Sequence, residues 1–224
     1  MLKLVLKDLL IQKAPMKNPV TNIAANILFV VVAQFFSAAC AYIVTPFIFT
    51  YSLLVYSCGF GEKNEVDVML NSLPVARKEV VYSKYISGAL FFIIGLVFTT
   101  VVCTLIKMTG LSNMKSYIKI QYIILGIIFS AVYCSVYIPM YLWRGNTKSQ
   151  PANNILTIVI FLSIVVVVLI TTFIDNGTAK SSIMELAASQ RFKFWGTAVS
   201  LVSSILMICI SLIISLKVYV NRDL

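Results

Sequence analysis

The sequence predicts an all-α membrane protein with six transmembrane helices. Of its 224 residues, 60% are hydrophobic and only 12% are charged, and the mean hydropathy is +0.95. A typical soluble domain is about half apolar and roughly a quarter charged, so this composition indicates another class. The apolar residues are also concentrated, because five long windows contain no Asp, Glu, Lys or Arg. These windows are residues 20–60, 85–106, 120–143, 149–174 and 194–216.

The lengths of these windows predict the number of spans. A hydrocarbon core of about 30 Å needs roughly 20 residues in a helix that rises about 1.5 Å per residue. Four windows each fit one span. The first window has 41 residues, so we expect a tight hairpin that turns around residues 37–42, with one long span plus a re-entrant segment as the alternative. The chain is then a single transmembrane domain, residues 1–224, with spans at about 20–38, 41–60, 84–106, 119–143, 151–174 and 194–217.

The Lys and Arg residues of the short loops predict the orientation, because positively charged loops tend to stay in the cytoplasm. With six spans, the two termini and the second and fourth loops share one side, and these segments hold twelve of the 18 Lys and Arg residues. We therefore expect both termini to be cytoplasmic. The net charge of +10 follows from this topology, and no separate basic domain is present to bind nucleic acid. Lys outnumbers Arg fourteen to four, which favours a bacterial cell membrane as the location.

Residues 1–18 predict a cytoplasmic helix that lies on the membrane surface. Lys3 and Lys7 share one face, and Pro15 and Pro19 end the segment before the first span. A membrane-surface anchor is the plain interpretation, and a contact with a cytoplasmic partner is the alternative. No cleavable signal is expected, so the first span should direct insertion. The apolar stripe has helical spacing and consists of Leu2, Val5, Leu6, Leu9 and Leu10.

A charged segment, residues 61–85, holds eight of the 26 charged residues. Within it, an apolar stripe predicts a short amphipathic helix over about residues 62–73, which Pro74 ends before a second helix leads into the third span. This helix could lie on lipid, but anionic headgroups repel acidic residues, so a groove on a soluble protein is the better hypothesis. The stripe is Val66, Met69, Leu70 and Leu73, and the acidic residues are Glu62, Glu65 and Asp67.

Several polar residues lie inside or near the predicted spans. Their default role is hydrogen bonding between helices, and the alternative is that they line a translocation path. The chain has no His and no charged residue well inside a predicted span, which argues against proton relay and leaves sodium coordination by carbonyl and hydroxyl oxygens open. The candidate path residues are Asn26, Gln34, Thr99, Thr100 and Ser130.

The sequence indicates no catalytic, metal or cofactor-binding site, and we do not expect the chain alone to be an enzyme. Its five cysteines lie within apolar windows without the close spacing of zinc ligands, and no disulfide is expected. Residues 176–181 resemble a phosphate-binding loop only superficially, because the Gly before the Lys is absent. They are better explained as a turn before a short external helix, residues 182–191, which Ser182 and Glu185 begin with a capping-box pattern.

Two segments carry a resemblance to a known family. They are KDLLIQK, residues 7–13, and EKN..D..LNSLPVARKEVV..KY, residues 62–85. Both are similar to the short permease subunits of ABC-2 type ATP-binding-cassette transporters. More narrowly, the chain resembles the membrane subunits of the phenol-soluble modulin exporter group, with bacitracin- and lantibiotic-resistance permeases as relatives. Gly61, Ala76 and the pair Glu65–Val66 depart from the family pattern.

The resemblance implies that the helix at residues 62–73 is a coupling helix, which docks into a separate cytoplasmic ABC ATPase subunit. ATP and Mg would be bound by that subunit, so this chain itself would bind no cofactor. A complete path needs two permeases, which implies a homodimer or a heterodimer with a similar permease. The implied ATPase contacts are Glu62, Lys63, Asn64, Asp67, Leu70, Asn71, Ser72, Leu73, Pro74, Arg77 and Lys78.

The implied function is the export of amphipathic or antimicrobial-type peptides, such as phenol-soluble modulins. Apolar spans without fixed charges also suit such a cargo. Two other classes of function stay open. One is a membrane sensor or immunity protein that binds a peptide without pumping it, and the other is a membrane enzyme that acts on lipid or peptide.

Overall fold

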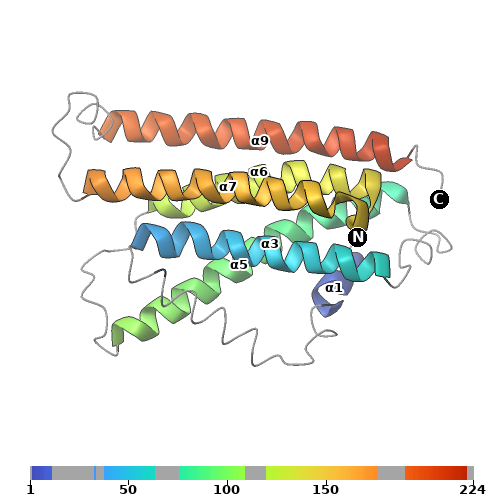
Figure 1. The fold of residues 1–224 in the computed structure, drawn as a ribbon, viewed down its shortest axis with the longest axis horizontal. Coiled ribbons are helices and arrows are strands. Elements are labelled where there is room, and N and C mark those ends of the chain that lie inside the picture. The colour runs from blue at the N-terminus through green and yellow to red at the C-terminus, as the bar shows by residue number, and fades with distance from the viewer. Residues whose placement is uncertain are drawn as a thin grey trace.

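The computed structural model describes residues 2–11, 33, 38–63, 76–108, 120–175 and 190–220, and its elements there are all helices (Figure 1). The expectation of an all-α protein is confirmed for this part of the chain. The helices are α1 (Leu2–Ile11), α3 (Ala38–Lys63), α5 (Arg77–Met108), α6 (Ile120–Arg144), α7 (Asn146–Asp175) and α9 (Gln190–Val220).

Five of these helices, all except α1, are long and apolar enough to cross a membrane. They overlap five of the segments for which spans were expected, since a charge-free apolar window of about 20 residues or more favours an uninterrupted helix. The predicted first span, residues 20–38, lies outside the described residues except for Ala33 and Ala38. The predicted coupling helix beyond residue 63 and the predicted external helix up to residue 189 also lie outside them.

The centre of the bundle is α6. It packs against α9, α3 and α7, while α3 packs along α5. Figure 1 shows α3, α7 and α9 running lengthwise, with α5 crossing them obliquely and α1 close to the C-terminal end of α3. In the apolar window of α3, 56% is buried, against 11% for α7 and 17% for α9. The core therefore lies around α3 and α6, and α7 and α9 present long apolar faces outward.

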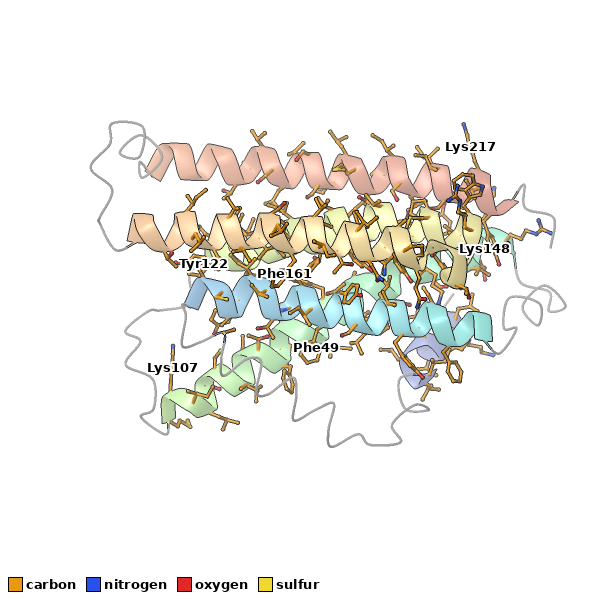
Figure 2. The ribbon with its side chains drawn as sticks, viewed as in Figure 1. Phe49, Lys107, Tyr122, Lys148, Phe161 and Lys217 are labelled. Carbon is orange, nitrogen blue, oxygen red and sulfur yellow. The ribbon has the colours of Figure 1, made fainter. Side chains whose placement is uncertain are left out.

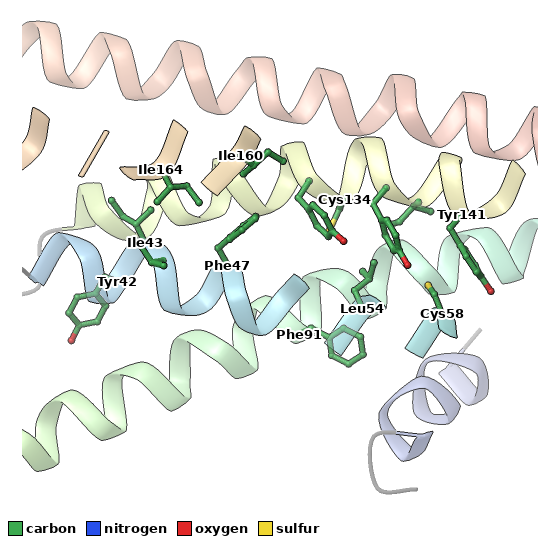
Figure 3. Close-up of a cluster of buried hydrophobic side chains, with 14 of the residues drawn as sticks. Tyr42, Ile43, Phe47, Leu54, Cys58, Phe91, Cys134, Tyr141, Ile160 and Ile164 are labelled. Carbon is green, nitrogen blue, oxygen red and sulfur yellow. The ribbon is translucent and has the colours of Figure 1, made fainter. Parts of the chain in front are cut away.

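A ladder of tyrosines on α6 forms part of the core. Tyr133, Tyr137 and Tyr141 recur every four residues, and consecutive rings stack with centroids 5.4 and 6.4 Å apart. Phe47 and Tyr51 of α3 meet Tyr133 edge-on, with centroids 5.8 and 5.6 Å away. Figure 3 shows Phe47 and Tyr141 in this cluster between α3 and α6. Aromatic pairs contribute about 0.5–1.5 kcal/mol beyond their buried area, so the ladder helps to fix α3 on α6.

Glycines allow α3 to approach its two neighbours closely. A Cβ atom at Gly95 of α5 would lie 2.7 Å from Phe49 Cβ and 3.2 Å from Pro46 Cα. A Cβ atom at Gly126 of α6 would lie 3.2 Å from the Tyr42 carbonyl oxygen. Pro46, four residues after Tyr42, has no N–H that could donate to the Tyr42 carbonyl. Small residues at such crossings let membrane helices pack backbone to backbone.

A single residue joins α6 to α7. Gly145 has a φ of 77°, in the left-handed region that glycine adopts without a Cβ clash. Its N–H donates to the Tyr141 carbonyl at 2.8 Å, and its own carbonyl accepts from the Ser149 N–H at 3.3 Å. The predicted spans were separated by residues 144–150, whereas α6 continues to Arg144 and α7 begins at Asn146.

Candidate functional site

One end of the bundle gathers the segments for which the sequence predicts a partner contact. The C-terminal ends of α3, α6 and α9 and the N-terminal ends of α5 and α7 lie there, together with α1 (Figure 1). Figure 2 places Lys148 and Lys217 at this end and Lys107 at the opposite end. We call it the loop end, because α3 ends there and α5 begins there on either side of residues 64–75.

The predicted ATPase-contact residues that the structure describes lie on either side of residues 64–75. Glu62 and Lys63 are the last two residues of α3. Arg77 and Lys78 are the first two residues of α5, and both side chains are exposed. The remaining predicted contacts lie outside the described residues, and they are Asn64, Asp67, Leu70, Asn71, Ser72, Leu73 and Pro74.

The loop end contains a buried ion pair between two distant parts of the sequence. Asp8 of α1 and Lys84 of α5 are 1% and 7% exposed, and Lys84 Nζ lies 3.0 Å from Asp8 Oδ1. Ser87 Oγ shares its one proton between the other carboxylate oxygen, Oδ2, at 3.0 Å and the Ser83 carbonyl of its own helix at 2.7 Å. Lys84 Nζ also donates to Ser57 Oγ of α3 at 3.3 Å. Asp8, Ser57, Lys84 and Ser87, which we call the Asp8 network, bring α1, α3 and α5 together.

The buried face of α1 is centred on this carboxylate. The apolar stripe predicted from the sequence is divided between two faces, because the bundle takes the side of the helix that carries Asp8. Residues three or four positions apart share a helix face, and Asp8 therefore lies above buried apolar neighbours. The buried neighbours are Leu4, Val5 and Ile11, while the outward face includes Leu6 and Leu10, which are 58% and 49% exposed.

The Asp8 network has the geometry that a buried charge pair requires. Two charges removed from water are tolerated when their remaining lone pairs and protons are also hydrogen-bonded. Both carboxylate oxygens of Asp8 accept a bond, and the Lys84 ammonium donates to two residues. Lys7 adds a longer contact, 3.9 Å to Asp8, from a side chain that is 30% exposed. Removing one member of a buried pair costs about 3–5 kcal/mol, because the other charge stays buried.

The Asp8 network was not predicted from the sequence, which favours a position for α1 on the membrane surface and indicates no partner for Asp8 or Lys84. One signal was present, since Asp8 is the acidic residue in a segment, residues 1–18, whose other charges are all Lys. Lys84 likewise stands immediately before a charge-free window. A pairing across 76 positions, however, leaves no periodic pattern in the sequence.

The candidate path residues do not form a common polar site in the part of the chain that the structure describes. Thr99 and Ser130 are buried, and Thr100 is half-buried. Each hydroxyl donates to a backbone carbonyl three or four residues earlier in its own helix, at 2.7–2.9 Å. Asn26 and Gln34 lie outside the described residues. The three described hydroxyls thus satisfy themselves locally and join neither another helix nor one another.

Another group of hydroxyls does connect helices. Ser211 Oγ of α9 donates to the Ser135 carbonyl of α6 at 2.6 Å. A serine has one hydroxyl proton, so Tyr85 of α5, whose OH lies 2.6 Å from Ser211 Oγ, must be the donor to it. Ser215 Oγ, 2.9 Å from the same phenol oxygen, then donates to Tyr85. This chain of hydroxyls holds α5, α6 and α9 together.

The described side chains offer no metal-binding cluster. Among them, no group of three or more His, Cys, Asp or Glu comes together, and all five cysteines are free thiols. The polar chemistry that is present consists of an ion pair and hydroxyl bonds between helices. Such contacts transmit position from one helix to another.

A comparison with known protein families matches residues 3–220 to a family described as ABC-2 family transporter protein. The matched region includes every long helix and most of α1. No curated protein and no solved structure matches the chain.

Proposed function

Since the chain belongs to the ABC-2 family of transporter proteins, we propose that it is the permease subunit of an ATP-driven exporter. A partner ATPase is implied by the family in general. In our proposal the partner binds ATP and Mg and docks on residues 62–78, while this chain has no catalytic site of its own. A second copy or a similar permease completes the path. The complex lies in a bacterial cell membrane, with both termini in the cytoplasm.

The observation that supports the docking site is the construction of the loop end. The Asp8 network links the helices that border residues 64–75 to α1. The exposed cations Arg77 and Lys78 are the first two residues of α5, just after this segment. From there α5 continues without a break for 32 residues, which corresponds to about 48 Å at 1.5 Å per residue. A displacement of the docking segment by the ATPase could therefore reach the far side of the membrane along one continuous helix, α5.

The proposed cargo is an amphipathic or antimicrobial-type peptide, of which phenol-soluble modulins are an example. Within the described parts of the long helices, charged residues lie only near the helix ends. The middle of each helix offers apolar and hydroxyl groups, which suits a cargo that partitions into lipid. The direction of transport, out of the cell, follows from the resemblance of residues 7–13 and 62–85 to exporter permeases.

Co-purification with the ATPase encoded beside this chain tests the docking site. The variant Asp67→Ala with Leu70→Ala should lose bound ATPase at least about tenfold, because truncating two central contacts at an interface typically removes more than 1.4 kcal/mol. The matched control is Val101→Ala with Leu105→Ala, which changes two exposed residues in the far half of α5. The docking assignment is wrong if the first variant retains as much ATPase as the control.

Transport by the reconstituted complex tests the cargo. Vesicles that contain the complex should accumulate a fluorescent phenol-soluble modulin peptide only when ATP is supplied on the ATPase side. A complex whose ATPase cannot hydrolyse ATP is the control. Peptide binding or protection that is equal in the two complexes would favour a sensor over an exporter.

A further inference from the structure

Lys84 of α5 links α1 to both helices that border the proposed docking segment. Lys84 lies two turns into α5, and Ser57 lies six residues before the end of α3. At about 1.5 Å per residue, Lys84 and Ser57 each lie roughly 10 Å from the end of their helix that borders residues 64–75. The Lys84 ammonium contacts Asp8 of α1 and Ser57 of α3 at the same time, so Lys84 links α1, α3 and α5 near the two helix ends that border residues 64–75.

The contacts of α1 are directional. Apolar packing alone would allow a short helix to slide or rotate on its neighbours, whereas charge-assisted hydrogen bonds fix its register. Both oxygens of the Asp8 carboxylate are used, by Lys84 and by Ser87, which lie on the same face of α5. The carboxylate cannot move relative to α5 without exposing a buried charge.

We propose that Asp8 and Lys84 are positioning residues, whose buried ion pair makes α1 move as one body with the adjoining ends of α3 and α5. This inference rests on the proposed function, since the motion comes from a docked ATPase. The outward face of α1 carries Leu6 and Leu10, which are exposed and apolar. A displacement of the docking segment would thereby also move the apolar surface that Leu6 and Leu10 form on α1.

Distances between spin labels in the complex with its ATPase test the one-body motion. Labels replace the exposed residues Leu6 of α1, Ile86 of α5 and Met207 of α9 in pairs, in a chain whose native cysteines are changed to alanine. On trapping the ATP-bound state, the 6–86 distance should stay within about 2 Å, while the 86–207 distance changes by more than that. A 6–86 distance that changes as much as the 86–207 distance would overturn the proposal.

Charge variants test the role of the ion pair. Asp8→Asn keeps the shape of the side chain but leaves Lys84 without its counter-charge. The number of peptides moved per ATP, compared at equal amounts of assembled complex, should fall at least about fivefold, the lower range of a typical coupling between sites. The exchange Asp8→Lys with Lys84→Asp should restore that ratio to within about twofold. Lys3→Gln, an exposed change on the same helix, is the control and should not alter it.

Ser87→Ala keeps the test decisive if Asp8→Asn does not assemble. It removes the hydrogen bond to the carboxylate and the bond to the Ser83 carbonyl but leaves the ion pair in place, so the complex should form and the ratio should fall about twofold. A purely structural role would lower the amount of complex and leave the ratio unchanged in every variant that assembles, which would overturn the inference. Failure of the proposed function looks different, because the wild-type chain would then bring down no ATPase.

Discussion

The phenol of Tyr133 on α6 donates a hydrogen bond to the side-chain oxygen of Asn153 on α7 over 3.0 Å, and both side chains are buried. The apolar window of α7 is only 11% buried, so this helix rests on a small contact area. A polar bond between helices persists in apolar surroundings because its loss would leave two unpaired groups there. The bond therefore fixes how α7 is rotated on α6.

Removing this bond should loosen α7. Tyr133→Phe keeps the ring in the tyrosine ladder and should lower the free energy of unfolding by about 0.6 kcal/mol, the average for such bonds in membranes. A double-mutant cycle with Asn153→Ala, read from unfolding in detergent, should give a coupling of similar size. Strictly additive effects of the two substitutions would show that the bond contributes nothing.

Filling the crossing of α3 and α5 should be destabilising. Gly95→Ala places a methyl group 2.7 Å from Phe49 Cβ, so the helices must separate, at a cost of about 1–3 kcal/mol. Gly196→Ala on α9 is the matched control, because a Cβ atom there meets nothing within 4 Å. Thermal unfolding in detergent should show a lower midpoint for Gly95→Ala and an unchanged or higher one for the control. Equal midpoints would contradict the close crossing.

The serines of α9 should differ in importance according to the face on which they lie. Ser211→Ala breaks the link from Tyr85 to the Ser135 carbonyl and should cost about 0.6–1.7 kcal/mol. Ser203→Ala, which removes an exposed hydroxyl bonded within its own helix, should change stability by less than about 0.5 kcal/mol. Resistance to unfolding by detergent measures both. An equal loss in the two variants would argue against the hydroxyl junction.

The two ends of α5 should react on opposite sides of the membrane. With the loop end in the cytoplasm, a membrane-impermeant maleimide should label Met108→Cys in intact cells, and this residue is 86% exposed. Lys78→Cys should be labelled only after the cells are permeabilised. Both variants carry Cys209→Ala, since that thiol is also exposed. Labelling of the Lys78 variant in intact cells would reverse the proposed orientation.

The long helices were predictable because their cause is local. A charge-free window of about 20 apolar residues favours a helix whatever its neighbours are. The rotation of each helix was not predictable in the same way, since a helix that is apolar on all sides carries no mark of its buried face. Thr99 and Thr100 illustrate the difference, because adjacent hydroxyls that both donate to a carbonyl of their own helix are buried to different degrees.

The site was predicted less completely than the fold. The docking segment stays a prediction, which came from a local contrast in charge between residues 61–85 and their surroundings. The Asp8 network depends on tertiary structure, because the burial of Asp8 follows from where Lys84 lies and from no pattern within residues 1–18. The amphipathic stripe of α1 was recognised, but the bundle covers a face with a carboxylate at its centre. The burial of this carboxylate is favourable only because a charged partner on another helix pairs with it.

The one-residue turn at Gly145 has a consequence for the biogenesis of the protein. Because only Gly145 lies between α6 and α7, α7 has to begin crossing the bilayer close to the point where α6 ends. The nascent chain is therefore expected to deliver residues 120–175 to the lipid as an antiparallel pair joined at one left-handed glycine. Tags or reporter domains for following synthesis belong at other turns, where they would not force this pair apart.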